Sequence, residues 1–385
     1  MIYLDHAATT PVHEVVLQKM YDIEKDIFGN PSSIHAFGRK AKRYLDEARR
    51  TIAHVISANE REIVFTSGGT EANNLAIVGT AFANKHRGNH IITSTQEHHA
   101  VLNTMRYLQK HGFHVTYVPV NETGKVRVED VQRSLTDETI LVSIMAVNNE
   151  TGVIQPIDEI GKLLKDHESY FHTDAVQAFS SLPFDVNKLN IDLLTASAHK
   201  INGPKGIGFL YVREDTPIEP LFFGGLQERE YRPGTENVVG AVGFQYAVEQ
   251  MLKDDRAHSK FCMRLKETFL SELRKRDVNF LINGDVDGSV PTIVNISFPD
   301  VTTDVMLANL DLEGIAASSG SACSAGTLEP SHVLEAMYKS DDERIMSAIR
   351  FSFGYKNDEE QMIEVATKIA MIIERLLEKG GIVRE

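Results

Sequence analysis

Lys200 stands where a run of apolar and hydroxyl residues gives way to a turn rich in glycine and proline. The run 192–197 is typical of a buried strand, and the turn 201–208 contains Gly203, Pro204, Gly206 and Gly208. Lysine is strongly hydrated and is seldom found at the end of a buried strand unless its amine is paired or chemically used. An amine at this position could form a Schiff base with an aldehyde cofactor. The segment alone is equally compatible with a lysine in a solvated turn.

A second segment could hold the phosphate group of such a cofactor. Gly68 and Gly69 follow a predicted strand, and a predicted helix begins near Thr70. Glycine permits close approach of the backbone, and the first turn of a helix offers unpaired N–H groups and the positive end of the helix dipole. Many α/β proteins use a turn of this kind as a plain connection, so the phosphate site is a hypothesis at this point.

Three further polar residues follow predicted strands. Asp174 could pair with a cation or a protonated ring, or it could cap a helix. His98 could stack on a planar ring or carry a proton. Its neighbour His99 is adjacent rather than at i, i+4 spacing, and no set of cysteines or acids accompanies the pair, so we expect no metal site. Asn149 could hydrogen-bond a ring hydroxyl, although asparagine is also common before a turn.

The elements that must position these residues alternate between strands and helices through the first two thirds of the chain. Helical patterns cover 70–84, 100–110 and 156–165. Such alternation predicts an α/β fold with a mostly parallel sheet that is covered on both faces. The predicted strands span residues 62–66, 90–93, 114–118, 140–145, 170–173, 192–197 and 208–212. Ligands bind at the carboxyl edge of such sheets, where we expect Gly69, Thr70, His98, Asn149, Asp174 and Lys200 to meet.

The pattern changes from about residue 239. A long charged helix over 240–277, a strand over 291–298 and a closing helix over 358–379 indicate a smaller α+β domain at the C-terminus.

Composition limits the class of protein. The chain has 385 residues, a formal net charge of −14 and two cysteines. The negative charge argues against a direct nucleic-acid binder, and no apolar run has the length of a membrane span. The first residues carry no basic start or signal-peptide core, and two cysteines do not make a disulfide framework. We therefore expect a cytoplasmic enzyme that is not attached to a membrane.

Taken together, these segments resemble the class V aminotransferase-like, fold type I pyridoxal-phosphate enzymes, and most closely the NifS/IscS cysteine desulfurases. The resemblance runs from residues 3–10 to residues 350–354, nearly the whole chain. The motifs that carry it are Thr66–Glu71, Glu97–His98, Val147–Gly152, His172–Gln177 and Ser197–Lys200.

The resemblance implies a fold and a role for each residue. The fold would be a large domain with a mostly parallel seven-stranded sheet, at 15–255, and a small α+β domain at 256–385, which residues 1–14 join. Lys200 would bind pyridoxal 5′-phosphate covalently, Asp174 would pair with the ring nitrogen, and His98 would stack on the ring. Asn149 and Gln177 would lie by the ring hydroxyl, and Arg350 would bind the substrate carboxylate together with Asn149. The phosphate ligands would be Gly69, Thr70, Ser197, His199 and, from the other subunit of a homodimer, Thr235.

The loop at about 316–330 consists almost entirely of small residues and contains Cys323. A flexible exposed loop with one thiol is suited to carry a group outward, although a packed core cysteine is an alternative. The resemblance makes Cys323 the nucleophile that takes sulfur from L-cysteine as a persulfide and releases L-alanine. It would make no lasting metal contact, at most a transient one with an iron–sulfur cluster. We interpret Cys262, on the long helix, as a packing residue.

Other functions stay open at this stage. Another enzyme of the same fold, such as an aminotransferase, a selenocysteine lyase or a C–S lyase, would not need the thiol of Cys323. A catalytically silent sulfur-transfer scaffold would not need Lys200, Asp174 and His98. The chain stops at Glu385, without the longer extension by which some IscS-like members dock a scaffold protein. The sulfur acceptor, an iron–sulfur scaffold protein or a tRNA thiolase, is therefore left open.

Overall fold

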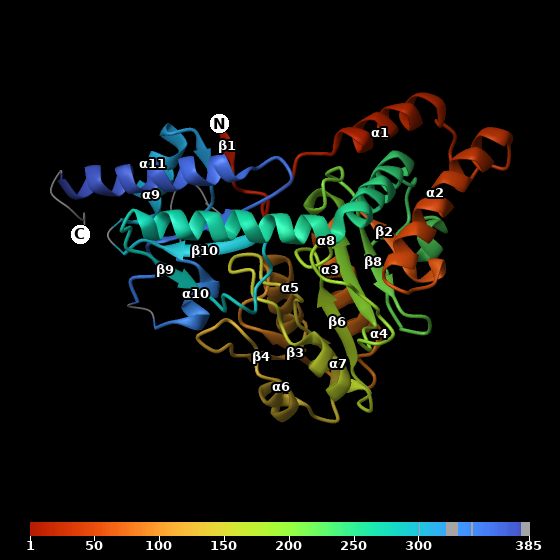
Figure 1. The fold of residues 1–385 in the computed structure, drawn as a ribbon. Coiled ribbons are helices and arrows are strands. Elements are labelled where there is room, and N and C mark those ends of the chain that lie inside the picture. The colour runs from red at the N-terminus through yellow and green to blue at the C-terminus, as the bar shows by residue number, and fades with distance from the viewer. Residues whose placement is uncertain (300, 321–329, 340–341, 379–385) are drawn as a thin grey trace.

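The computed structural model describes residues 1–299, 301–320, 330–339 and 342–378, without the side chains of 254–257, so that Cys323 lies outside the described residues. A seven-stranded sheet with its helices forms a large lobe, and a three-stranded sheet with its helices forms a small lobe (Figure 1). One long helix, α8 (Val238–Lys275), runs along both lobes.

The large sheet has the strand order β2-β8-β7-β6-β5-β3-β4. The strands from β7 to β4 are parallel to one another, and β8 is antiparallel to both of its neighbours. The mostly parallel α/β sheet is thus confirmed. The bounds are β2 Ile63–Thr66, β3 His90–Ser94, β4 His114–Val118, β5 Thr139–Ser143, β6 Tyr170–Asp174, β7 Leu193–Ser197 and β8 Gly208–Val212. Each of the seven predicted strands overlaps one of these within two residues at either end.

Helices cover both faces of this sheet. Successive side chains of a strand point to opposite faces, so apolar residues of one strand pack on both sides. In β8, Phe209 and Tyr211 pack on one face, and Leu210 and Val212 pack on the other. The helices of the first face are α2 (Ala36–Val55), α6 (Val128–Ser134), α7 (Ile157–Leu164) and the first part of α8. The second face is covered by α5 (His99–Lys110) and by the helical stretch 69–83, which consists of α3 (Gly69–Asn74), a π-helical turn (Leu75–Gly79) and α4 (Thr80–Ala83).

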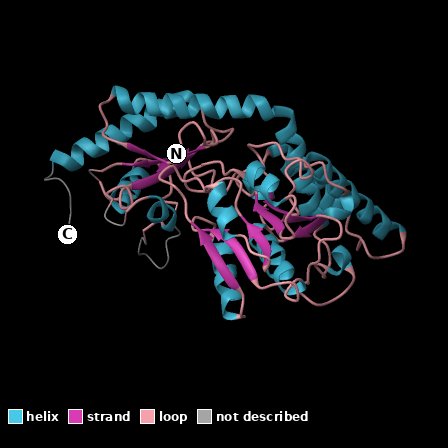
Figure 2. Cartoon of the chain, turned by 90° about the horizontal axis from the view of Figure 1, so that it is seen from below, coloured by secondary structure: helices cyan, strands magenta, loops and turns pink. Residues whose placement is uncertain are grey.

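The small lobe contains an antiparallel sheet in the order β12-β10-β9 and a separate parallel pair, β1 with β11. The second half of α8 packs with α11 (Glu359–Glu378) in its core, whereas the first half packs with α1 (Glu14–Asp26) and α2 (Figure 2). The strands are β1 Ile2–Tyr3, β9 Leu281–Asn283, β10 Ile293–Ser297, β11 Ile315–Ala316 and β12 Ala348–Ser352, and the remaining helices are α9 Thr303–Leu312 and α10 His332–Met337. The domain boundaries at residues 14/15 and 255/256 stay predictions.

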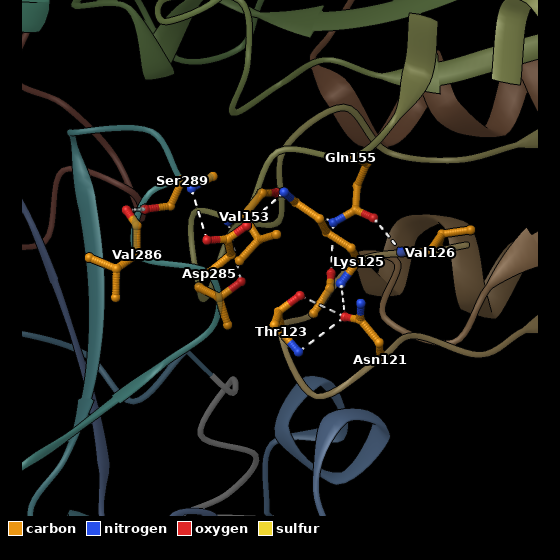
Figure 3. A network of polar contacts seen from close by, with 12 residues as sticks. Asn121, Thr123, Lys125, Val126, Val153, Gln155, Asp285, Val286 and Ser289 are labelled. Carbon is orange, nitrogen blue, oxygen red and sulfur yellow. Dashed lines mark hydrogen bonds and ion pairs between the residues drawn. The ribbon is translucent and has the colours of Figure 1, made fainter. Parts of the chain in front are cut away.

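Polar contacts join the large lobe to the small lobe. Figure 3 shows Lys125, in the loop after β4, in an ion pair with Asp285, in the loop after β9, at 2.7 Å. The backbone N–H of Ile154 donates to the carbonyl of Gly288 at 2.9 Å. Among the described residues, no helix combines the length and apolar character that crossing a bilayer requires.

Candidate active site

A cavity of about 430 Å³ opens at the carboxyl edge of the large sheet, beside the small lobe. The loops that follow β2, β3, β5, β6 and β7 all contribute to its wall. Nearly all predicted site residues line it: Gly69, Thr70, His98, Asn149, Asp174, Gln177, Ser197, His199, Lys200 and Arg350. The structure thus brings together segments that are far apart in the sequence, while their chemical roles stay predictions.

The predicted phosphate-binding turn lies tightly against the sheet. Gly68 has φ +154°, which disfavours a side chain, and a Cβ at Gly69 would lie 2.8 Å from Cγ2 of Val176. The helical stretch 69–83 begins at this turn, so the first N–H groups of the helix and the hydroxyl-bearing Thr70 and Ser197 border the cavity. This is a backbone arrangement that suits an anion.

Asp174, the last residue of β6, is held through both carboxylate oxygens. Asn73 Nδ2 donates to Oδ2 at 2.7 Å, and the N–H of Val176 donates to Oδ1 at 2.9 Å. The side chain is only 6% exposed, yet it borders the cavity. A buried acid in this position is suited to a protonated ring nitrogen.

His98 caps α5, with Nδ1 accepting the N–H of Ala100 at 3.1 Å. The ring borders the cavity, and desolvation by the surrounding protein lowers the pKa of His98. The imidazole is therefore mainly neutral above pH 7 and can accept a proton.

Lys200 lies in the turn after β7, as predicted, but it is not solvated as a surface lysine would be. Its Nζ donates to the carbonyl oxygens of Ala7 and Ala8, the latter at 2.8 Å. Burial and the nearby Arg350 guanidinium lower the pKa of Lys200 to about 8. The unprotonated fraction of the amine near neutral pH is therefore much larger than that of an exposed lysine, and this is the form that Schiff-base formation requires.

Arg350, at the centre of β12, is 4% exposed and reaches the cavity from the small lobe. Its Nη1 donates to the carbonyl of Asn149 at 3.0 Å, and its Nη2 forms an ion pair with Asp5 at 2.9 Å. Each terminal nitrogen of a guanidinium carries a second N–H, so a substrate carboxylate could still be bound.

Two of the predicted cofactor ligands that line the cavity also contact the N-terminal segment. Gln177 donates from Nε2 to the carbonyl of Ala7 at 2.8 Å. His199 Nδ1 lies 3.2 Å from the Thr9 hydroxyl, and burial lowers the pKa of His199 to about 4. The ring is thus neutral and can serve a phosphate only as a hydrogen-bond partner, not as a cation.

Thr235 does not reach the cavity of its own chain and is exposed. Its loop is anchored on the large lobe, because the buried Glu228 accepts bonds from Arg49 and from the N–H of Phe65. Arg232 adds an ion pair with Glu71 at 2.8 Å. A held but exposed loop is compatible with a contact to a second subunit.

Buried carboxyl groups lie directly behind the cavity. Glu97 is fully buried, and desolvation raises its pKa to about 8. Glu150 accepts a bond from the Ser331 hydroxyl at 2.5 Å, and burial raises its pKa to about 7. Cys323 and residues 321–329 of its loop lie outside the described residues, whereas Cys262 is fully buried on α8, in line with the predicted packing role.

Sequence reasoning missed two contacts. Asn73 lies one helical turn after Gly69, so the i, i+4 spacing could have placed it on the face toward the cavity. Asp5 follows the apolar run Ile2–Leu4, where an acid calls for a partner, but nothing local identifies Arg350 as that partner. Among the described residues no cluster of three or more ligating side chains could hold a metal ion.

Comparison with known proteins gives a consistent result. Residues 2–365 match the family described as aminotransferase class-V. The chain is 52% identical, over 97% of its length and 99% of the relative, to "Putative cysteine desulfurase IscS 1" of Bacillus subtilis strain 168. It is 46% identical, over 97% of its length and 95% of the relative, to "Cysteine desulfurase IscS" of Dictyoglomus turgidum.

Solved structures agree. A protein described as "NIFS-LIKE PROTEIN" superposes with a TM-score of 0.91 at 37% identity, over 97% of this chain and 100% of that one. "SspA in complex with cysteine" superposes with a TM-score of 0.82 at 38% identity, over 92% and 99%.

Proposed function

The chain belongs to the class-V aminotransferase family and, within it, to the cysteine desulfurases, and we propose that it converts L-cysteine to L-alanine with the aid of pyridoxal 5′-phosphate. One observation supports this most directly: an amine of lowered pKa (Lys200), a fixed acid (Asp174) and a carboxylate-binding guanidinium (Arg350) line one cavity. These are the groups that an amino acid and a phosphorylated pyridine aldehyde require.

The residues of the site fit this cofactor. Lys200 would hold its aldehyde carbon, Asp174 its ring nitrogen and His98 its ring face, with Asn149 and Gln177 near the hydroxyl. The turn at Gly69 and Thr70 would hold the phosphate with Ser197 and His199. When bound, the cofactor supplies an electron sink for bonds at the substrate's α-carbon. Lys200, whose pKa is lowered to about 8, can hold or release a proton near neutral pH, and the mainly neutral His98 can accept one.

The sulfur transfer itself needs a nucleophile, and the proposal assigns Cys323. Its thiolate attacks the sulfur of bound L-cysteine, so that an S–S bond forms and the Cβ–S bond breaks. The electron pair of the broken bond and a proton go to the β-carbon of the substrate. L-Alanine then leaves, and a persulfide stays on Cys323. Another enzyme of the same fold would act without this thiol.

Alanine release and persulfide formation test the proposal together. The protein purified with its cofactor should absorb visible light, release L-alanine from L-cysteine, and gain one sulfur atom on the peptide that contains Cys323. Cys323→Ala should abolish both outcomes, while Cys262→Ala, a change of the other thiol, should abolish neither. Undiminished alanine release by Cys323→Ala would reject the persulfide mechanism, and a colourless protein after addition of pyridoxal phosphate would favour a silent scaffold.

We further propose a homodimer in which Thr235 serves the partner's phosphate site. Apolar side chains are exposed near its loop, where Phe223 is 89% and Leu226 78% exposed. Phe28, after α1, and Phe37, at the start of α2, are also exposed, with their ring centroids 5.1 Å apart. Exposed apolar groups of this size mark an interface. Leu226 and Pro31 line the same surface cavity, so the two regions are adjacent.

Mixed dimers can test the exchange of Thr235. If Thr235 acts on the partner, a mixed dimer of Lys200→Ala and Thr235→Ala subunits contains one site that has both residues intact. Activity should then reappear when the two variants are refolded together. If Thr235 acts within its own subunit, each site of the mixed dimer lacks one residue and no activity returns.

The persulfide would pass to an acceptor protein. An iron–sulfur scaffold protein and a tRNA thiolase are both predicted acceptors, and a transfer assay that offers both to the persulfide form decides between them. A cytoplasmic location stays a prediction from the two-cysteine composition.

A further inference from the structure

Asp5 contacts Arg350 from the N-terminal segment, which pairs with β11 of the small lobe and accepts hydrogen bonds from Lys200 of the large lobe. Its Oδ1 is 2.9 Å from Nη2 of Arg350, and its side chain is 21% exposed, against 5% for the arginine. The backbone at Asp5 is fixed as well, since it bridges to Ser352 of the strand that carries Arg350. The backbone therefore holds Asp5 beside the strand that carries Arg350.

Asp5 offsets part of the positive charge that lines the cavity. Among the described residues of its wall, Lys200 and Arg350 are basic and Asp174 is acidic. His98 and His199 do not alter this balance near neutral pH, because burial lowers the pKa of each. The wall alone thus carries an excess positive charge, which Asp5 offsets from the second layer.

We propose that Asp5 determines specificity: it offsets the charge of Arg350 so that the site accepts an amino acid with one carboxylate and disfavours one with an anionic side chain. The inference rests on the proposed function, because it takes Arg350 as the group that binds the α-carboxylate. A substrate carboxylate on Arg350 shares the charge of the guanidinium with Asp5. A second anionic group on the same ligand then meets two carboxylates around one guanidinium, and their repulsion is screened less in a partly buried site than in water.

The field of Asp5 extends into the cavity as well as to its ion-pair partner. Asp5 acts on the pKa of Lys200 in the upward direction, against burial and Arg350, which lower it. Lys200 lies on the opposite, large-lobe side of the site. An anionic ligand between the two residues would therefore experience the repulsion.

L-Aspartate and L-asparagine form a suitable pair of probes, because they have nearly the same shape and differ by one side-chain charge. Calorimetry on the cofactor-loaded protein gives both dissociation constants without depending on turnover. We expect the wild type to bind L-asparagine more tightly than L-aspartate. In Asp5→Asn the ratio of the two constants should shift toward L-aspartate by roughly fivefold or more, the size expected when one nearby charge is removed from a partly buried site.

Asp192→Asn is the matched control. Asp192 pairs with Arg213 at 2.9 Å and its side chain is 20% exposed, but it precedes β7 at the other end of the strand from Lys200. The Asp192→Asn protein should keep the wild-type ratio of the two dissociation constants. An Asp5→Glu protein, which retains the charge, should have a ratio near that of the wild type. If Asp5→Asn does not fold, Asp5→Ser supplies the neutral side chain.

The outcomes are distinct. A ratio in Asp5→Asn within twofold of the wild type, or a shift toward L-asparagine, would overturn the role of Asp5. A wild-type protein that binds neither amino acid and forms no alanine would instead overturn the proposed function.

Discussion

Asn73 donates a hydrogen bond over 2.7 Å to Oδ2 of Asp174 and thereby joins the helix that begins at the glycine turn to the acid at the end of β6. Both residues are buried, and the remaining carboxylate oxygen is bound by the N–H of Val176. The acid is thus oriented before any ligand arrives. The two features that would hold the ends of one cofactor, its phosphate and its ring nitrogen, are fixed relative to each other by a single amide.

Asn73→Ala should lower the free energy of unfolding of the cofactor-free protein by about 1–3 kcal/mol, because it leaves a buried carboxylate oxygen without a donor. Urea denaturation measures the change. Asn84→Ala is the control: Asn84 is also buried, but it donates to neutral carbonyls of Thr80 and Pro217. The variant at residue 73 should cost more, since bonds to a charged acceptor are stronger. Equal losses in both variants would contradict the orienting role of Asn73.

Glu97 should make the stability of the protein depend on pH. Burial raises its pKa from 4.5 to about 8, so the folded state binds this proton more tightly than the unfolded state. The stabilisation is complete below pH 4.5 and is lost as the pH rises through 8. Glu97→Gln should remove this loss, and its unfolding free energy relative to the wild type should rise by about 2–4 kcal/mol between pH 5 and pH 9.

Urea titrations at several pH values test this expectation. Glu122→Gln, a change at an exposed position, should leave the pH dependence of the wild type intact. A constant difference between Glu97→Gln and the wild type across the range would show that Glu97 does not titrate there.

The large lobe could be predicted from the sequence because most of its strands are short, largely apolar runs between turns. A strand that is buried on both faces appears in the sequence as a nearly continuous apolar run. The end of the run then marks the edge of the sheet where ligands bind. His98, Asp174 and Lys200 could therefore be assigned to one edge before their distances were known.

The support of these residues could not be predicted in the same way. Asn73 and Asp174 are 101 positions apart, and Asp5 and Arg350 are 345 apart, so only the tertiary packing brings them together. The strand β12 also escaped prediction, because Arg350 interrupts its apolar pattern. A charge within a strand makes sense only when its partners, Asp5 and the carbonyl of Asn149, are known.

Cys262 should resist alkylation in the folded protein. Its side chain is fully buried, and burial raises the pKa of its thiol to about 12. At pH 8 its reaction with iodoacetamide should be slower than that of an exposed thiol by more than about a thousandfold, since the thiolate is the reactive form. Peptide mass spectrometry should find the label on Cys323 in the folded protein and on both cysteines in urea. Similar labelling rates at the two cysteines in the folded state would refute the packing role of Cys262.

Gly320→Ala should destabilise the protein beyond the cost of its backbone conformation. Gly320 has φ +82°, and an added Cβ would lie 2.7 Å from Oε2 of Glu150. Gly112 has a similar φ of +88° with nothing within 4 Å, so Gly112→Ala reports the backbone cost alone, about 1 kcal/mol.

The variant at residue 320 should lose about 2–4 kcal/mol in urea denaturation, because the Glu150 carboxyl is buried and held by the Ser331 hydroxyl. A Glu150→Ala change in the Gly320→Ala background should restore part of that loss, since it removes the group that clashes. Equal losses in Gly320→Ala and Gly112→Ala would mean that the Glu150 carboxyl yields, and Glu150 would then not fix the chain at either Gly320 or Ser331.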